Sequence, residues 1–380
     1  MSNTTSERPR VLFVGRARYR LPLPPWLAKK WDAVEAELDY RILGAAEPGS
    51  PLRAERFRLS APARPGRLDG ILFHLRLPFR VRQELTSFRP AAIVAADPFV
   101  GAAVLAGRLL ARSRVPVIVE VHGDWRTFTR LYGSPSRQLI ARVADALAAW
   151  TVRRADATRA LSRFTSSLVE DVRGRPADAI FPTYSDLSAF TDRPQQELPA
   201  RPTALFVGML EPYKNVVGLA AAWRRVVQAR PNAQLVVVGK GTQHDVIGAL
   251  VRDLPEQVVH VRELDPDGVA RAFDDATLLV LPSWPEGLGR VVIESFARGR
   301  GVVATDAGGI PDLVDDGVQG ILIPPADEEA LVAALVRVLG ERDLAERLGA
   351  AAHERYADWH TTPVAFARSY RQLVDRTTAR

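Results

Sequence analysis

Short apolar runs alternate with longer amphipathic ones throughout the second half of the chain. The apolar runs are four to six residues long and rich in Val, Ile and Leu, which is typical of strands buried on both faces of a parallel sheet. The predicted strands are Ala204–Gly208, Gln234–Gly239, Val258–Val261, Thr277–Leu281, Gly301–Thr305 and Gly320–Ile323. Helical patterns such as Val216–Ala229 and Glu328–Leu339 lie between them. The alternation predicts an α/β domain in which helices cover both faces of a parallel sheet.

The first half of the chain repeats this pattern less regularly. Its predicted strands and helices are Arg10–Gly15, Pro24–Leu38, Ala91–Ala96, Val115–Val121 and Ala141–Arg154. The stretch Pro48–Arg67 is rich in Pro, Arg and Ala, so we expect a poorly ordered connection there. The Pro-rich segment Asp192–Pro202 is the best candidate for a linker between domains. We therefore expect one domain over residues 1–192, a second over residues 193–361, and a terminal helix within residues 362–380.

Composition narrows the class of protein. At 380 residues, with 47% hydrophobic and 25% charged residues, the chain fits two globular domains of ordinary size. It contains no cysteine, so disulfides, thiol nucleophiles and thiolate zinc sites are excluded. The N-terminus lacks the apolar core of a signal peptide, and the longest apolar stretches are interrupted by charged residues and prolines. We expect a cytoplasmic protein.

Charge is unevenly distributed along the chain. The net charge is +7, but residues 1–190 contain 30 Lys and Arg against 18 Asp and Glu, whereas residues 191–380 contain 21 against 26. The two halves therefore carry +12 and −5. A basic half indicates an anionic partner such as a lipid headgroup or a phosphorylated acceptor, although compositional bias in an Arg-rich chain is the alternative. A nucleic acid is disfavoured, because the basic residues do not interleave with aromatic residues on a recognisable module.

The most informative segment runs from Pro282 to Ala297. It places two glutamates, Glu286 and Glu294, eight positions apart around a predicted strand-to-helix turn. The helix around Glu294 is almost entirely apolar, which predicts burial, and a buried carboxylate needs a partner. A hydroxyl-rich ligand beyond the carboxyl end of the strand would supply one. The alternative is a glutamate on an exposed stripe, paired with Arg290 or Arg298.

This segment resembles the Glu-x7-Glu signature of family-four-type glycosyltransferases (glycosyl transferases group 1), which are retaining enzymes with the two-domain GT-B fold. The resemblance extends over residues 203–325, through Leu205–Gly208, Lys214, Val236–Gly239, Ala307–Pro311 and Asp316–Gly317. It implies two facing Rossmann-like domains and a C-terminal helix that crosses back to the first. It also implies that a nucleoside-diphosphate sugar binds the second domain, that a hydroxyl acceptor enters from the first, and that neither cofactor nor metal is required.

The resemblance assigns roles to residues of the second domain. Lys214 matches the lysine that contacts the donor diphosphate, for which a point charge is well suited. Glu286 matches the glutamate that hydrogen-bonds the donor sugar, and Glu294 matches the one that holds the ribose hydroxyls. We expect Lys214, Glu286 and His122 to be catalytic. The other expected donor-binding residues are Gly15, Arg16, Gly208, Lys240, Gly287, Leu288, Gly289 and Arg290.

One phosphate-binding cation of the family is missing from this chain. Met209 stands where the family has an arginine directly after Gly208. Lys240 and Arg290 are the candidate substitutes, and reduced activity is the alternative. The turn at Gly287–Gly289 opens a helix, whose free N–H groups and dipole favour an anion.

In the first half, His122 ends a predicted strand and matches the family histidine that faces the reacting sugar. Arg18, Asp124 and Arg126 are candidates for orienting the acceptor. The segment Gly15–Arg20 corresponds to the family's glycine-rich phosphate loop, but it has one glycine and three arginines. It would therefore bind donor phosphate or an anionic acceptor. Because this half is basic, we also expect peripheral contact with an anionic membrane, at the inner face.

Two rival functions remain open at this point. One is a nucleotide-sugar epimerase on the same fold, and the other is a catalytically weakened nucleotide-sugar-binding relative, which Met209 and the altered first loop suggest. Asp265 and Asp267 match the Asp-x-Asp metal motif of the other glycosyltransferase fold. They precede a predicted helix, however, where Asp267 is expected to be the N-cap.

Overall fold

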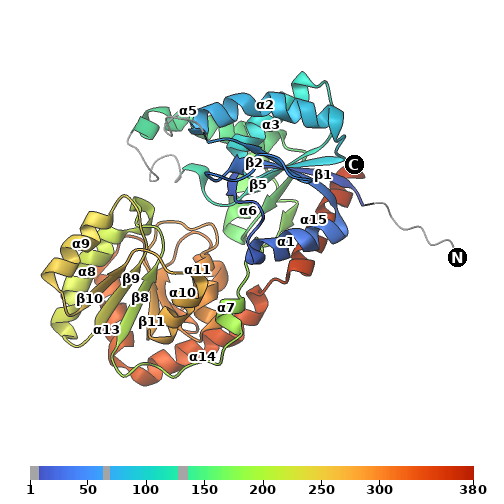
Figure 1. Cartoon of the computed structure of the whole chain (residues 1–380). Coiled ribbons are helices and arrows are strands. Elements are labelled where there is room, and N and C mark those ends of the chain that lie inside the picture. Colours follow the sequence, from blue (N-terminus) through green and yellow to red (C-terminus); the bar gives the residue numbers. More distant parts are fainter. Residues whose placement is uncertain (1–7, 63–68, 127–135) are drawn as a thin grey trace. The chain divides into compact units, whose positions relative to one another are not determined.

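The computed structural model describes residues 8–62, 69–126 and 136–380, without the side chains of residues 136–140. The chain divides into two compact units. The first consists of Met1–Trp125, Ile140–Ser185 and Thr361–Arg380, and the second of Arg126–Leu139 and Asp186–His360. Each unit contains a parallel sheet with interleaved helices (Figure 1), so the predicted α/β class with two Rossmann-like units is confirmed.

The sheet of the first unit has seven strands in the order β3-β2-β1-β4-β5-β6-β7. The strands are β1 (Arg10–Tyr19), β2 (Asp39–Ala46), β3 (Phe57–Ser60), β4 (Ala92–Ala95), β5 (Val117–Val121), β6 (Ala157–Ala160) and β7 (Ala179–Ile180). All neighbouring strands are parallel. Every residue of β4 and β5 is buried, as expected for central strands covered on both faces.

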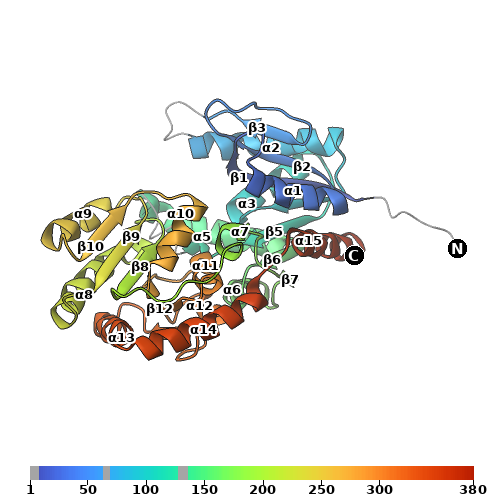
Figure 2. The same ribbon diagram turned by 60° about the horizontal axis from the view of Figure 1, so that its bottom comes forward.

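Helices cover the two faces of this sheet. On one face, α1 (Pro25–Glu37) and α15 (Pro363–Thr378) lie side by side (Figures 1 and 2). Their core includes Phe13, whose ring centroid lies 5.3 Å from that of Trp31 and 5.4 Å from that of Tyr370. The opposite face is covered by α2 (Asp69–Ser87), α3 (Pro98–Leu110), α5 (Ser136–Arg154) and α6 (Arg163–Arg173). The C-terminal helix therefore returns to the first unit, as predicted.

The sheet of the second unit has six strands in the order β10-β9-β8-β11-β12-β13. The strands are β8 (Thr203–Val207), β9 (Gln234–Val238), β10 (Val258–Val261), β11 (Leu278–Leu281), β12 (Gly301–Thr305) and β13 (Gly320–Ile323). The helices are α7 (Ser188–Thr191), α8 (Val216–Ala229), α9 (His244–Asp253), α10 (Pro266–Asp274), α11 (Arg290–Ala297), α12 (Ile310–Leu313), α13 (Glu328–Gly340) and α14 (Arg342–Trp359). Trp223 of α8 and Leu335 of α13 are completely buried in its core.

Three local expectations are wrong. The stretch Pro48–Arg67 contains the edge strand β3, because its alternating Phe57 and Leu59 turn into the core. The predicted loop Gly15–Arg20 is mostly strand, since β1 continues to Tyr19 after an irregularity between Val14 and Arg18. The N-cap of α10 is Asp265, whose carboxylate accepts a hydrogen bond from the backbone N–H of Gly268 at 2.7 Å.

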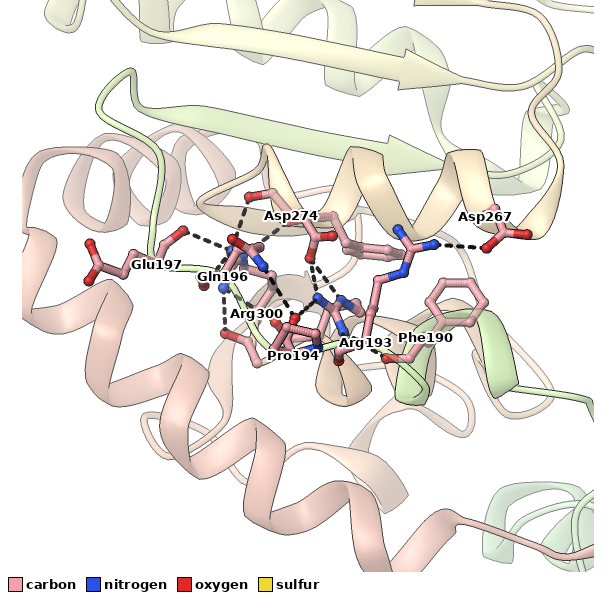
Figure 3. A network of polar contacts seen from close by, with 11 residues as sticks. Phe190, Arg193, Pro194, Gln196, Glu197, Asp267, Asp274 and Arg300 are labelled. Carbon is pink, nitrogen blue, oxygen red and sulfur yellow. Dashed lines mark hydrogen bonds and ion pairs between the residues drawn. The ribbon is translucent and has the colours of Figure 1, made fainter.

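The segment predicted as a linker, residues 192–202, packs on the second unit. Two arginines of that unit, Arg298 and Arg300, donate hydrogen bonds to its backbone and to the residues just before it (Figure 3). The accepting carbonyl oxygens belong to Phe190, Arg193, Pro194, Gln196 and Glu197, at 2.7–3.1 Å. Arg298 is fully buried and also binds Asp274 through Nε and Nη2, at 2.8 and 2.6 Å. The chain leaves the first unit earlier, after Ser185.

Candidate active site

In a parallel sheet the carboxyl ends of the strands meet at one edge, where ligands of such folds bind. Most of the predicted donor residues follow neighbouring strands of the second sheet. Gly208 and Lys214 follow β8, Lys240 follows β9, and Glu286 follows β11. Because β8 lies between β9 and β11, these residues share one edge of the second unit.

Lys214 and Glu286 form an ion pair at this edge. Lys214 ends a short 3₁₀ turn, and its Nζ donates a hydrogen bond to Oε1 of Glu286. The two side chains are only 9% and 13% exposed. The loops that carry them also meet through their backbones, since the N–H of Trp284 donates to the carbonyl of Tyr213 at 2.7 Å. The sequence assigns the two residues separate ligands, whereas the structure joins them to each other.

Glycines allow the surrounding loops to approach closely. A Cβ on Gly208 would lie 3.3 Å from Cε of Lys214, and one on Gly309 would lie 2.4 Å from the carbonyl oxygen of Gly287. The N–H of Gly309 donates to the carbonyl of Glu286 at 2.8 Å. The loops after β11 and β12 are therefore held together through their backbones, which fixes the position of Glu286.

Glu294 is buried in α11 and already has a partner. Its Oε1 accepts a hydrogen bond from Nε of Arg290 at 2.7 Å, and Arg290 itself is 60% exposed. Burial raises the pKa of Glu294, and the charge of Arg290 offsets this only in part. Glu294 therefore pairs with Arg290, as the alternative prediction stated, but the glutamate lies on a buried helix and not on an exposed stripe. Arg298 pairs with Asp274 instead. Gly289, with φ +84°, caps α11 without a side-chain hydrogen bond.

The candidate substitutes for the missing cation differ in their surroundings. Met209 is 40% exposed. Lys240 is half exposed and pairs with Glu263 at 2.7 Å, whereas Arg290 stands in the first turn of α11, beside the buried Leu288. Both cations lie at the carboxyl edge of the sheet. Their part in binding phosphate stays a prediction.

Sequence reasoning did not identify Glu211, a buried carboxylate of the same edge. It accepts hydrogen bonds from the backbone N–H and the hydroxyl of Thr242, at 3.2 and 2.8 Å. The backbone N–H of Leu210 also donates to the carbonyl of Lys240 at 3.0 Å. Glu211 therefore joins the loop after β8 to the loop after β9 and supports the loop that carries Lys214.

In the first unit, His122 lies directly after β5 and rests on a buried carboxylate. Its Nε2 is 3.1 Å from Oε2 of Glu120, and its side chain is 43% exposed. Glu120 is also bound by Arg159 at 2.6 Å and by the hydroxyl of Tyr370. Burial alone would raise the pKa of Glu120, but the charge of Arg159 and hydrogen bonds from His122 and Tyr370 hold it well below its usual range. The carboxylate therefore orients the imidazole of His122. No local motif indicates this arrangement.

A cavity of about 150 Å³ adjoins this group within the first unit. Gly15, Lys30, Glu120, His122 and Arg159 are among the residues that line it. Burial lowers the pKa of Lys30 to about 8, and the nearby charge of Arg159 adds to this lowering while that of Glu120 opposes it. The cavity thus combines a histidine with a lysine whose pKa is lowered to about 8, and this lysine is not among the predicted site residues.

The remaining predicted residues of the first unit lie in different places. Arg18 pairs with Asp69 of α2 at 2.9 Å, and Arg16 reaches the neighbouring Gly70, whose missing Cβ would lie 2.8 Å from Nη1. Asp124 belongs to the first unit, and Arg126 falls within the residue range of the second. Their roles toward donor or acceptor stay predictions.

Among the described residues, no group of three or more His, Asp or Glu side chains is arranged to hold a metal ion. Likewise, none of the described helices has the length and apolar character needed to cross a membrane.

Comparison with known protein families gives two matches that together span most of the chain. The family described as Glycosyl transferase 4-like domain matches residues 6–183, and the family described as Glycosyl transferases group 1 matches residues 201–341. These two ranges fall largely on the first and the second sheet, respectively.

Curated relatives are also transferases or synthases of saccharides. Glycogen synthase of Mycobacterium tuberculosis is 29% identical over 295 residues, which cover 75% of this chain and 69% of the relative. Alpha-D-kanosaminyltransferase of Streptomyces kanamyceticus is 27% identical over 296 residues, which cover 73% of this chain and 74% of the relative. The families and relatives named here give no support to the epimerase alternative.

Solved structures show the same fold over nearly the whole chain. Sucrose-phosphate synthase from Thermosynechococcus elongatus has a TM-score of 0.75 and 19% identity, covering 98% of this chain and 100% of that one. Anabaena HepE in complex with UDP-glucose has a TM-score of 0.69 and 16% identity, covering 97% and 100%. The family matches cover both units and agree with the function that the glutamate pair predicts. The solved structures agree with the fold of two parallel sheets. The chain belongs to the GT-B glycosyltransferases of the family-four type, glycosyl transferases group 1.

Proposed function

We propose that this glycosyltransferase moves a sugar from a nucleoside-diphosphate sugar to an acceptor hydroxyl, with retention of configuration at the anomeric carbon and without a metal ion. The observation that carries the proposal is the arrangement of Lys214, Glu286 and Glu294 around the carboxyl edge of the second sheet. Two buried ionisable side chains, Lys214 and Glu294, and the half-buried Glu286 at a ligand-binding edge are costly to the fold, and such groups cluster at functional sites.

Glu294 and Glu286 are proposed to hold the donor. As a carboxylate, Glu294 can accept hydrogen bonds from two vicinal ribose hydroxyls. Among the described contacts, Arg290 binds only its Oε1, which leaves Oε2 to accept hydrogen bonds from a ligand. Glu286 would bind hydroxyls of the transferred sugar while its other oxygen stays near Lys214.

Lys214 is proposed to stabilise the departing diphosphate. When the bond between the anomeric carbon and the phosphate oxygen breaks, negative charge grows on the diphosphate, and a fixed cation in a site of low dielectric constant stabilises it. The N–H groups at the start of α11 would add to this effect. These groups would supply the charge that a metal ion supplies elsewhere, so we propose that no metal is needed.

The acceptor is proposed to attack from the side that the leaving group vacates. The acceptor oxygen forms a bond to the anomeric carbon, and its proton passes to an oxygen of the leaving diphosphate. Within the first unit, His122 and the cavity beside it are the proposed site for the acceptor. The net charge of +12 on residues 1–190 supports an anionic or lipid-linked acceptor. Peripheral contact with an anionic bilayer is part of this proposal, and sedimentation with anionic vesicles should then weaken as salt is raised.

A thermal-shift screen against nucleoside diphosphates and their sugars tests the donor site, because a ligand that binds the native state raises its melting temperature. The ligand found should bind Glu294→Gln roughly tenfold more weakly than wild type, which is the scale of one lost hydrogen bond to a charged group. Glu346→Gln is the matched control, because Glu346 also pairs with an arginine four residues earlier, Arg342, at 2.8 Å, but on an exposed helix. Equal binding by both variants would remove Glu294 from the donor site.

Transfer itself is tested by release of nucleoside diphosphate in the presence of candidate acceptors, with and without a chelator. Product with the donor's anomeric configuration supports retention, and inverted product contradicts it. Loss of transfer in chelator contradicts metal independence. Donor binding without turnover on any acceptor would instead support the catalytically weakened relative that Met209 suggests.

A further inference from the structure

A second cluster of charge lies in the first unit, away from the site described above. A pocket of about 280 Å³ is lined by four arginines, Arg41, Arg53, Arg58 and Arg80. One carboxylate, Glu84, also lines it, and it is buried and bound to Arg41 at 2.6 Å. Within the described part of the chain, no carboxylate forms an ion pair with the other three arginines. The pocket therefore concentrates an excess of positive charge in a volume close to the roughly 300 Å³ of small ligand sites.

The four arginines come from four consecutive parts of the fold. Arg41 is on β2, Arg53 precedes β3, Arg58 is on β3, and Arg80 is on α2. The backbones of Arg53 and Arg58 form an antiparallel bridge, so two residues of like charge are paired across it. Such a pairing is unfavourable unless something compensates it. The pairing of two arginines therefore does not stabilise this hairpin by itself.

Some N–H groups of Arg58 and Arg80 donate hydrogen bonds to the protein, and others have no described acceptor. Nη1 of Arg58 donates to backbone carbonyls, including that of Ala54 at 2.6 Å. The two Nη atoms of Arg80 donate to Ser60 Oγ and to the carbonyl of Arg58. Among the described contacts, the Nε and Nη2 groups of Arg58 and the Nε of Arg80 have no acceptor. Burial lowers the pKa of both arginines, and the charge of Glu84 opposes this lowering. Repulsion from Arg53 adds to the lowering for both arginines, and repulsion from Arg41 adds to it for Arg58. An anion in the pocket would relieve this repulsion.

The pocket does not belong to the proposed transfer site. Arg41 lies near the beginning of β2, and Gln83, Glu84 and Ser87 of the lining lie in the last turns of α2. In a parallel sheet these positions are at the amino end of the strands, whereas His122 and the cavity beside it follow the carboxyl ends. A ligand of the arginine pocket would therefore occupy a separate site.

We propose that this pocket binds the phosphate group of a phosphorylated ligand, held by Arg53, Arg58 and Arg80. The planar guanidinium fork matches two phosphate oxygens at once, and several such forks around one cavity favour a phosphate over a single carboxylate. A soluble phosphate ester and a phospholipid headgroup share this chemistry. The pocket is open enough at the exposed Arg53 to admit either one. The proposal is independent of the donor site.

The test is a calorimetric titration of the full-length chain with inorganic phosphate at constant ionic strength, with chloride as the reference anion. Wild type should bind phosphate saturably. Arg53→Gln should bind roughly tenfold more weakly, because one charged hydrogen-bond donor is lost. Arg53 is exposed and anchors no described side-chain contact, so this variant should fold. Arg58→Lys, which keeps the charge but loses the fork, should also weaken binding. Arg76→Gln is the matched control, since it removes an exposed arginine from the same helix as Arg80 and should bind like wild type.

Two further arms separate the possible sources of signal. Phosphate binding should persist in Lys214→Met, which damages the proposed donor site only. Vesicles containing phosphatidic acid, compared with phosphatidylcholine alone, show whether a lipid headgroup is accepted, and retention should depend on Arg53 and Arg58 if it is. The proposal is overturned if neither phosphate nor phosphatidic acid vesicles bind, or if Arg53→Gln and Arg58→Lys bind as wild type does.

Discussion

Replacing Glu286 by Gln should lower the stability of the fold and the rate of turnover, but raise the affinity for a nucleoside diphosphate. In the native chain the Lys214 side chain is 9% exposed, and its described ion-pair partner is Glu286. Breaking a buried ion pair by removing one charge costs about 3–5 kcal/mol, because the other charge stays buried and unpaired. Glutamine keeps one acceptor oxygen in the same place, and a hydrogen bond to a charged group recovers about 1.5–3 kcal/mol. We therefore expect Glu286→Gln to remain folded, with a loss of about 2 kcal/mol in the free energy of unfolding.

The same substitution should change ligand binding in the opposite direction. A nucleoside diphosphate must compete with Glu286 for Lys214 in the native protein. Once the carboxylate is neutral, the diphosphate becomes the main countercharge of the lysine, and its affinity should rise by up to about tenfold. Turnover should fall, because a neutral amide holds the sugar hydroxyls more weakly than a carboxylate does. Urea unfolding, calorimetry with the nucleoside diphosphate and steady-state rates measure the three quantities.

Glu263→Gln provides the control for this experiment. Glu263 also pairs with a lysine at the carboxyl edge of the same sheet, Lys240 at 2.7 Å, but its side chain is 71% exposed. It should leave the unfolding free energy and the turnover unchanged. If Glu286→Gln unfolds like wild type and turns over at the full rate, Glu286 is neither a buried partner of Lys214 nor a catalytic residue.

Two further predictions concern residues outside the predicted set of site residues. Arg298→Met should cost about 3–5 kcal/mol of unfolding free energy, because it leaves the Asp274 carboxylate and several backbone carbonyls without their donor. Chemical denaturation measures this loss. The control Arg342→Met, which replaces a half-exposed arginine, should cost far less. Below pH 5, the native protein should lose stability as Glu120 takes up a proton in the unfolded state before the folded one, since its folded pKa is depressed from 4.5. Unfolding midpoints between about pH 3 and 6 should therefore rise less steeply with pH in Glu120→Gln, and parallel curves would contradict the buried carboxylate's role.

Sequence patterns determined the second unit almost completely. Its strands are short apolar runs buried on both faces, so each one is recognisable without knowledge of its neighbours. The predicted strands at Val258–Val261, Gly301–Thr305 and Gly320–Ile323 coincide with β10, β12 and β13. In the first unit, β3 is hidden in a Pro- and Arg-rich stretch, and α2 has Pro78 within it. Only packing on the sheet overrides these weak local preferences.

The chemistry of the site divides in the same way. Glu286, Glu294 and Lys214 are identified in the sequence because they match the motifs of the family it resembles, and the fold then brings the strand ends before them to one edge. The partners of the charged residues, in contrast, are not visible in the sequence. Glu120 meets Tyr370 across 250 residues of sequence, Lys214 meets Glu286 across 72, and Arg298 meets Phe190 across 108. No local pattern encodes such contacts, because the cost of burying a charge is set by what the rest of the chain places beside it. The sequence thus determined which residues carry charge at the site, and only the tertiary structure decided how each charge is held.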